Sequence, residues 1–96
     1  MADLQADYDA LQSMANIFEQ AAQQFDQMQN SIQNMASVLE GGALKGVAGD
    51  RLVRLLQSNL ARKVAFGAEK FRELKQDVLD AMGDLSDADQ QGASQF

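Results

Sequence analysis

Cysteine, histidine, tryptophan and proline are all absent from the 96 residues of this chain. Without cysteine there is neither a disulfide framework nor thiolate chemistry, so the sequence does not indicate a redox compartment. Without cysteine and histidine the usual zinc and copper ligands are missing, and so is the commonest general acid or base near neutral pH. We therefore expect no metal, no cofactor and no enzymatic activity.

Long apolar runs are also lacking. No stretch approaches the roughly 20 residues that a membrane span needs. The segment "MADLQADYDALQ" has neither the basic start nor the apolar core of a cleavable signal peptide. These features predict no stable membrane insertion. They leave two expectations open: a cytoplasmic protein, or one exported by a route that does not use such a signal.

Basic residues are few and unevenly placed. The net charge is −6, which argues against nonspecific nucleic-acid binding. Residues 1–40 carry six acids and no base, and residues 41–75 carry eight bases and three acids. Residues 76–96 carry five aspartates and no base. Blocks of alternating sign constrain how the segments of the chain pair with one another.

Apolar residues in the first half follow a 4-3 spacing, which keeps one face of a helix against a partner helix. The pattern predicts a helix over residues 3–40, with Asp3 as N-cap and Gly41 and Gly42 as its C-terminal stop. Only Gln29 interrupts the apolar seam, which otherwise consists of Leu4, Tyr8, Leu11, Ala15, Phe18, Ala22, Phe25, Ile32, Ala36 and Leu39.

The second half repeats this pattern and predicts a helix over residues 50–88, with Asp50 as N-cap. The spacing contains one 4-4 step, at Leu56, Leu60 and Val64. The pattern is lost after residue 88, so residues 89–96 are predicted to form a flexible tail. The seam comprises Val53, Leu56, Leu60, Val64, Gly67, Phe71, Leu74, Val78, Ala81, Leu85 and Ala88.

Two such helices joined by a glycine-rich turn over residues 41–49 predict an all-α fold, an antiparallel two-helix hairpin. Folding back about the turn places Phe25 opposite Gly67, so that the missing side chain leaves room for the ring. It also sets large residues against small ones at four other positions, namely Leu11 with Ala81, Ala36 with Leu56, Ala22 with Phe71 and Ala15 with Val78. The same register brings the basic Arg62, Lys63, Lys70 and Arg72 alongside Glu19 and Asp26.

A second set of apolar residues lies beside the seam and exceeds what a soluble monomer usually exposes. We expect this set to pair with a second copy or with a paralogous hairpin, giving a four-helix bundle. The alternative is that the hairpin's own core takes up part of it. The expected interface residues are Met14, Ile17, Ala21, Met28, Met35, Val38, Leu55, Phe66 and Met82.

The central stretch "LEGGALKGVAGDRL" has Leu44, Gly46, Ala48 and Leu52 in a pattern that resembles the turn motif of the WXG family. These early-secreted-antigen-like proteins of type VII secretion systems are helical hairpins. Their turn reads Trp-x-Gly-x-Ala, followed by an apolar residue. Here Leu44 stands in the place of the Trp. In physical terms Leu44 would cap the core at the turn, while the family suggests a groove at the hairpin tip that meets a partner's export signal.

The resemblance implies a small secreted protein, or a co-secreted partner or chaperone, which acts through helix–helix contacts and is cytoplasmic before export. A secretion-system ATPase or a larger effector is a further partner that it implies. The family's export motif, Tyr-x-x-x-Asp or Glu, is absent, because the only tyrosine is Tyr8 and Gln12 stands at the fourth place after it. Two other readings remain open: a hairpin subunit of a secretion needle or filament, and a protein that binds a membrane surface. The lack of basic residues before residue 41 argues against the membrane reading.

Overall fold

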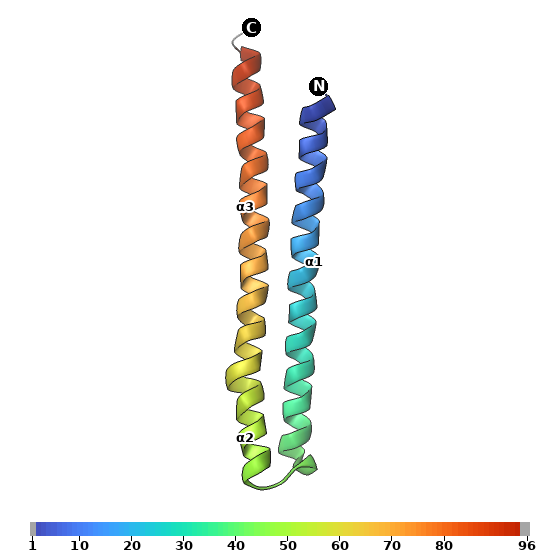
Figure 1. The fold of residues 1–96 in the computed structure, drawn as a ribbon, viewed down its shortest axis with the longest axis vertical. Coiled ribbons are helices and arrows are strands. Elements are labelled where there is room, and N and C mark those ends of the chain that lie inside the picture. Colours follow the sequence, from blue (N-terminus) through green and yellow to red (C-terminus); the bar gives the residue numbers. More distant parts are fainter. Residues whose placement is uncertain (1, 95–96) are drawn as a thin grey trace.

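Two long helical arms lie antiparallel in the computed structural model, joined by one short connection (Figure 1). The structure describes the backbone of residues 2–94 and the side chains of residues 4–88. The molecule measures 75 × 17 × 13 Å. The first arm begins and the second arm ends at the same tip, opposite the connection. The predicted all-α hairpin is confirmed, and no strand occurs in the described part of the chain.

The first arm is one continuous helix, α1 (Ala2–Val38), which ends in a wider turn, η1 (Leu39–Ala43). The second arm has three parts. Helix α2 (Val47–Leu55) leads into a π-helical turn, η2 (Leu56–Leu60), and helix α3 (Ala61–Ser94) completes the arm. The arms are held together along their length, mainly by α1 against α3.

The predicted register between the arms is correct at Phe25 and Gly67. A Cβ placed on Gly67 would lie 3.0 Å from Cε2 and 3.2 Å from Cδ2 of the Phe25 ring, so the ring occupies the space that the glycine leaves open. Phe71 stacks on Phe25 with ring centroids 5.4 Å apart, and Phe18 adds a tilted contact with Phe71 at 6.1 Å. An aromatic cluster therefore fixes the middle of the hairpin.

Small residues dominate the core, because only two helices enclose it. Eight apolar residues are buried among those described: Ala15, Ala22, Ile32, Ala36, Ala61, Val64, Ala68 and Val78. Ile32 packs with Ala61 and Val64, and Phe25 and Leu56 cover this cluster from the sides. The three phenylalanine side chains of the seam, Phe18, Phe25 and Phe71, are only partly buried, so part of each ring is exposed to solvent.

The π-helical turn shifts the seam locally, from Leu60 to Ala61. The Ala61 N–H donates to the Leu56 carbonyl, a bond that spans five residues instead of four. Ala61 therefore faces α1 and is buried, and Val64 and Ala68 follow it on the same face of α3. The prediction that Leu60 and Leu74 belong to the seam is wrong, because these side chains are 44% and 43% exposed.

The ends of the helices differ from the predicted bounds for local reasons. The Asp50 N–H donates to the Gly46 carbonyl at 3.1 Å, so the second arm begins at Val47 and Asp50 lies in its first turn instead of capping it. Helix α1 begins at Ala2, before the predicted cap Asp3. Helix α3 continues to Ser94, past the predicted helix end at residue 88. The flexibility predicted for residues 89–96 stays a prediction, and residues 95–96 lie outside the described part.

The contact between Phe25 and Gly67 leads to a prediction with an internal control. Gly67→Leu should lower the free energy of unfolding by about 1–3 kcal/mol, less the gain in helix propensity, because the new side chain meets the ring. Gly83→Ala should raise it by about 1 kcal/mol, because a Cβ on Gly83 meets open space. Urea denaturation of both variants provides the test, and a Gly67→Leu protein more stable than the parent would show that this packing is wrong.

The extra residue in η2 gives a second prediction. Deleting Ser58 should turn η2 into an ordinary α-helical turn and keep Val53 and Val64 in register, at a cost of less than about 1 kcal/mol. Deleting Glu69, in regular helix, should rotate the remainder of α3 by about 100° and remove most of the stability. Thermal melts monitored by circular dichroism compare the two. Equal losses would contradict our account of η2.

Candidate partner-binding flank and turn groove

One side of the hairpin, next to the seam, carries an apolar strip that we call the apolar flank. On α1 it consists of residues at seven-residue spacing and their neighbours one turn away, and on the second arm it consists of exposed leucines. Its members are Met14, Ile17, Ala21, Met28, Met35 and Val38 with Leu52, Leu55, Leu60 and Leu74. Because a seven-residue repeat stays on one side of a helix, these side chains form a strip along the rod.

Two shallow grooves show that the arms meet along this flank. In the first, Met28 and Met35 of α1 lie beside Leu60 and Val64 of the second arm. In the second, Met35 and Val38 lie beside Leu52 and Leu56. Since the two grooves share Met35, they form one surface that approaches the turn.

The flank is well exposed to solvent. Met14, Met28 and Met35 are 44%, 47% and 49% exposed, and Ile17 and Val38 are about 60% exposed. Leu52, Leu55, Leu60 and Leu74 are also exposed, whereas Ala21 is half-buried. This much exposed apolar surface on one side of a small protein is typical of a binding surface.

The other side of the seam is polar and already has partners within the chain. Glu19, Asp26, Gln33 and Glu40 recur on α1 at seven-residue spacing. Arg72 donates to both carboxylate oxygens of Asp26, at 2.7 and 3.5 Å, which holds the pKa of that carboxyl below its ordinary value. The Arg72 pKa is raised in turn by the same hydrogen bonds. We call this side the polar flank.

Further polar contacts continue the polar flank toward both tips. Lys75 lies 3.5 Å from a Glu19 oxygen, and the Gln57 amide donates to Glu40 at 3.3 Å. The prediction that basic residues return alongside Glu19 and Asp26 therefore holds for Arg72, and Lys75 joins it. Lys70 instead pairs with Glu73 of its own helix at 3.0 Å. Exposed ion pairs of this kind add little stability, but they keep this side hydrated.

Two of the expected interface residues lie apart from the apolar flank. Phe66 is 59% exposed, and it is two residues from both buried Val64 and Ala68, which turns it to the side of α3 away from α1. The Lys70 ammonium lies 5.0 Å from its ring centroid, a cation–π contact. Met82 is half-buried and, at seven-residue spacing from the buried positions, belongs to the seam.

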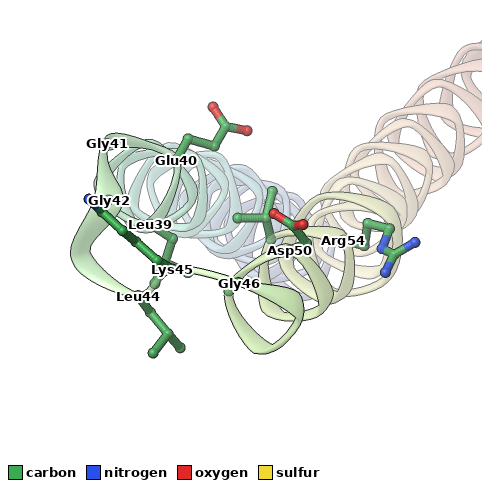
Figure 2. Close-up of a pocket in the computed structure, with 11 residues that line it drawn as sticks. Leu39, Glu40, Gly41, Gly42, Leu44, Lys45, Gly46, Asp50 and Arg54 are labelled. Carbon is green, nitrogen blue, oxygen red and sulfur yellow. The ribbon is translucent and has the colours of Figure 1, made fainter.

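The four residues of the predicted turn motif lie around the connection, but not with equal roles. Gly46 has φ +88° and precedes α2, a conformation that favours glycine. Leu44 is 43% exposed, and Figure 2 shows its side chain pointing away from the helices, so it does not cap the core as expected. Ala48 is exposed, and Leu52 belongs to the apolar flank.

An open groove with a volume of about 730 Å³ lies at the turn (Figure 2). It contains charges of both signs, with Glu40 at the end of the first arm, Lys45 on the connection, and Asp50 and Arg54 on α2. Its remaining lining residues are Leu39, Gly41, Gly42, Leu44, Gly46, Gly49 and Val53. Such a mixed, shallow lining is suited to a peptide or protein surface, because a small molecule usually needs a more enclosed apolar cavity.

Sequence reasoning missed Gly49, the one buried residue of α2. A Cβ at this position would overlap the backbone carbonyl of Leu44. Gly49 therefore lets the connection lie directly against the start of α2. The glycine content of the stretch is a signal for such an approach, but which glycine is needed depends on the path of the backbone.

No helix within residues 2–94 is both long and apolar enough to cross a membrane. Among the described side chains, no three potential acidic, histidine or cysteine ligands come together as a metal site.

Comparisons with known proteins find no similar one. No protein-family model matches the chain. No curated protein and no solved structure matches it either.

The close approach at Gly49 yields a prediction about the turn. Gly49→Ala should lower the free energy of unfolding by about 1–3 kcal/mol, because the methyl group meets the Leu44 carbonyl. Gly41→Ala is the control, since a Cβ there meets nothing within 4 Å, and it should change stability by less than about 1 kcal/mol. Urea denaturation decides, and equal effects of the two substitutions would refute the described path of the turn.

Proposed function

We propose that this protein is a small non-enzymatic partner protein that acts by pairing its apolar flank with another helical hairpin. The observation that carries the proposal is the difference between the two flanks. The polar flank satisfies its charges within the chain, whereas the apolar flank exposes methionine, isoleucine, valine and leucine side chains to water. Covering the apolar flank would remove this surface from solvent, and apolar burial is the main driving force of association.

The size of the apolar flank suits a stable dimer. From Met14 to Val38 the strip runs for roughly 36 Å at 1.5 Å per residue, and two adjacent helices make it roughly 20 Å wide. The resulting area of roughly 700 Å² approaches the ~800 Å² that each partner contributes to a standard protein interface. Pairing in this way would give a four-helix bundle.

The charge distribution favours a second copy in antiparallel orientation. The turn half of the second arm exposes Arg51, Arg54, Arg62 and Lys63. The opposite tip exposes acids from both arms, namely Asp7, Asp9, Asp77, Asp80, Asp84 and Asp87. Antiparallel copies would place the basic half of each beside the acidic half of the other, whereas parallel copies would place like charges together. A paralogous hairpin with the same polarity is the other partner that the test can reveal.

The proposed setting is a type VII secretion system, with this protein as a secreted substrate, co-secreted partner or chaperone that is cytoplasmic before export. Its support is the resemblance of Leu44, Gly46, Ala48 and Leu52 to the WXG turn, together with the hairpin fold. The groove at the turn is a second surface on which a larger effector or the secretion ATPase would dock. Nothing in this proposal involves catalysis, nucleic acid or membrane insertion.

A hairpin subunit of a needle or filament is the alternative, favoured by the extended 75 Å shape. The two proposals differ in the symmetry of the interface. A flank that pairs with itself closes a dimer, whereas a filament needs two different surfaces that do not close. Light scattering against concentration distinguishes a plateau at the dimer mass from continued growth.

Matched charge substitutions test the pairing surface. Met28→Glu should raise the dimer dissociation constant at least about tenfold, because a carboxylate would be buried in the flank. Gln33→Glu adds the same charge on the polar flank and should change the dissociation constant less than about threefold. Sedimentation velocity measures both. A parent protein that is a compact monomer at ~100 µM, alone and with candidate hairpin partners, would reject the proposal.

Export is tested in a bacterium with a type VII system by removing residues 87–96. The shortened chain should keep its fold and lose secretion if the acidic end of α3 is recognised by the machinery. Circular dichroism checks the fold, and immunoblots of medium and cells measure secretion. Normal secretion of the shortened chain would show that this segment is not the signal, and secretion unaffected by loss of the system's ATPase would reject the type VII setting.

A further inference from the structure

We propose that Met14, Met28 and Met35 are a modification site at which peroxide controls pairing of the apolar flank. Oxidation of these three side chains to sulfoxides on the free hairpin blocks the binding of a second copy. This inference rests on the proposed function, since it assigns a form of regulation to the same surface.

The three methionines share one position in the fold. They lie at seven-residue spacing, or a multiple of it, on the same side of α1, and their exposed fractions lie between 44% and 49%. The chain has no cysteine, so its oxidisable sulfur is all in methionine. Met82 is half-buried at the seam, which gives peroxide less access to its sulfur than to the three on the flank.

The chemistry needs only the oxidant and the thioether. The sulfur attacks one oxygen of hydrogen peroxide, the O–O bond breaks and an S–O bond forms. The second peroxide oxygen leaves as water after taking up a proton, so sulfur loses two electrons and peroxide gains them. The product is methionine sulfoxide, which is reversible through sulfoxide reductases.

The consequences differ between the free hairpin and the pair. On the free hairpin each sulfoxide faces water, and none of the three side chains belongs to the buried core, so the fold is kept. In the pair the sulfoxide oxygen of Met35 would lie in a groove whose other lining residues are Val38, Leu39, Leu52 and Leu56, with Asn34 as its one polar residue. The surface that this groove presents to a partner is apolar. Burying a polar group without a partner disfavours association.

The test compares pairing before and after treatment of the full chain with hydrogen peroxide. Mass spectrometry of proteolytic peptides measures which methionines gain one oxygen, and circular dichroism measures helix content. Sedimentation velocity then gives the dissociation constant. Oxidation of Met14, Met28 and Met35 should raise it at least about tenfold with helix content unchanged. Because pairing covers the sulfurs, their oxidation should also slow as protein concentration rises.

Two variants assign the effect to these residues. The triple variant with Met14→Leu, Met28→Leu and Met35→Leu keeps the apolar volume, so it should pair like the parent and no longer respond to peroxide. Met82→Leu is the control and should respond as the parent does.

The outcomes separate this inference from the proposed function. A parent that pairs equally well with all three methionines oxidised overturns the inference and leaves the proposed pairing intact. A triple variant that still loses pairing in peroxide also overturns it, because another group is then responsible. An untreated parent that does not pair at all rejects the proposed function and this inference together.

Discussion

A single seam between two helices is the constraint on which the rest of this structure depends. The arms can stay close along their whole length only if each large side chain faces a small one on the other arm. Phe25 over Gly67 is the clearest case, with Phe71 stacked beside it. Elsewhere alanine, valine and Ile32 fill the space, and the core is one layer thick. A layer this thin cannot enclose the neighbours of the seam, so both flanks remain at the surface.

The exposed side chains of the two flanks differ in whether they have partners within the hairpin. The polar flank carries carboxylates that Arg72 and Lys75 neutralise across the arms. Among the described residues the apolar flank is left uncovered, and it presents flexible methionine side chains that adapt to a facing surface. A one-sided apolar surface is best covered by a partner with the same property. Two hairpins joined in this way form a closed unit whose outer surface is polar.

The sequence predicted the hairpin and its register because both depend on local spacing and on one missing side chain. The 4-3 repeat marked the two arms, and Gly67 marked the place where a ring must fit. Leu74 was misplaced although Phe71 and Val78 on either side of it keep their predicted places, because the seam there passes beside the half-buried Lys75 instead. Leu60 was misplaced because one extra residue in η2 brings Ala61 into the seam in its place. The 4-4 step at Leu56 was its only sign. A spacing pattern alone does not show whether a helix contains a π-helical turn.

The candidate site was predicted less completely. The methionine repeat on α1 was visible in the sequence, but Phe66 could be separated from it only once the seam of α3 was known. Gly49 was missed because its role depends on the path of the Leu44 backbone, a contact that no residue type specifies. Leu44 itself points outward, although an apolar residue at the turn suggested a core position.

The central claim, that the apolar flank pairs with a second copy in antiparallel orientation, is tested most directly by a distance between two copies. The natural chain has no cysteine, so Val47→Cys, at a position 71% exposed beside the turn, can carry a single spin label. Pulsed electron paramagnetic resonance then measures the distance between the labels of the two copies. Antiparallel pairing centred on the middle of the flank predicts about 50 Å, which is twice the roughly 24 Å of helix between residue 63 of the second arm and Val47. A distance below about 25 Å would mean parallel pairing, which leaves the two basic halves side by side and contradicts the account.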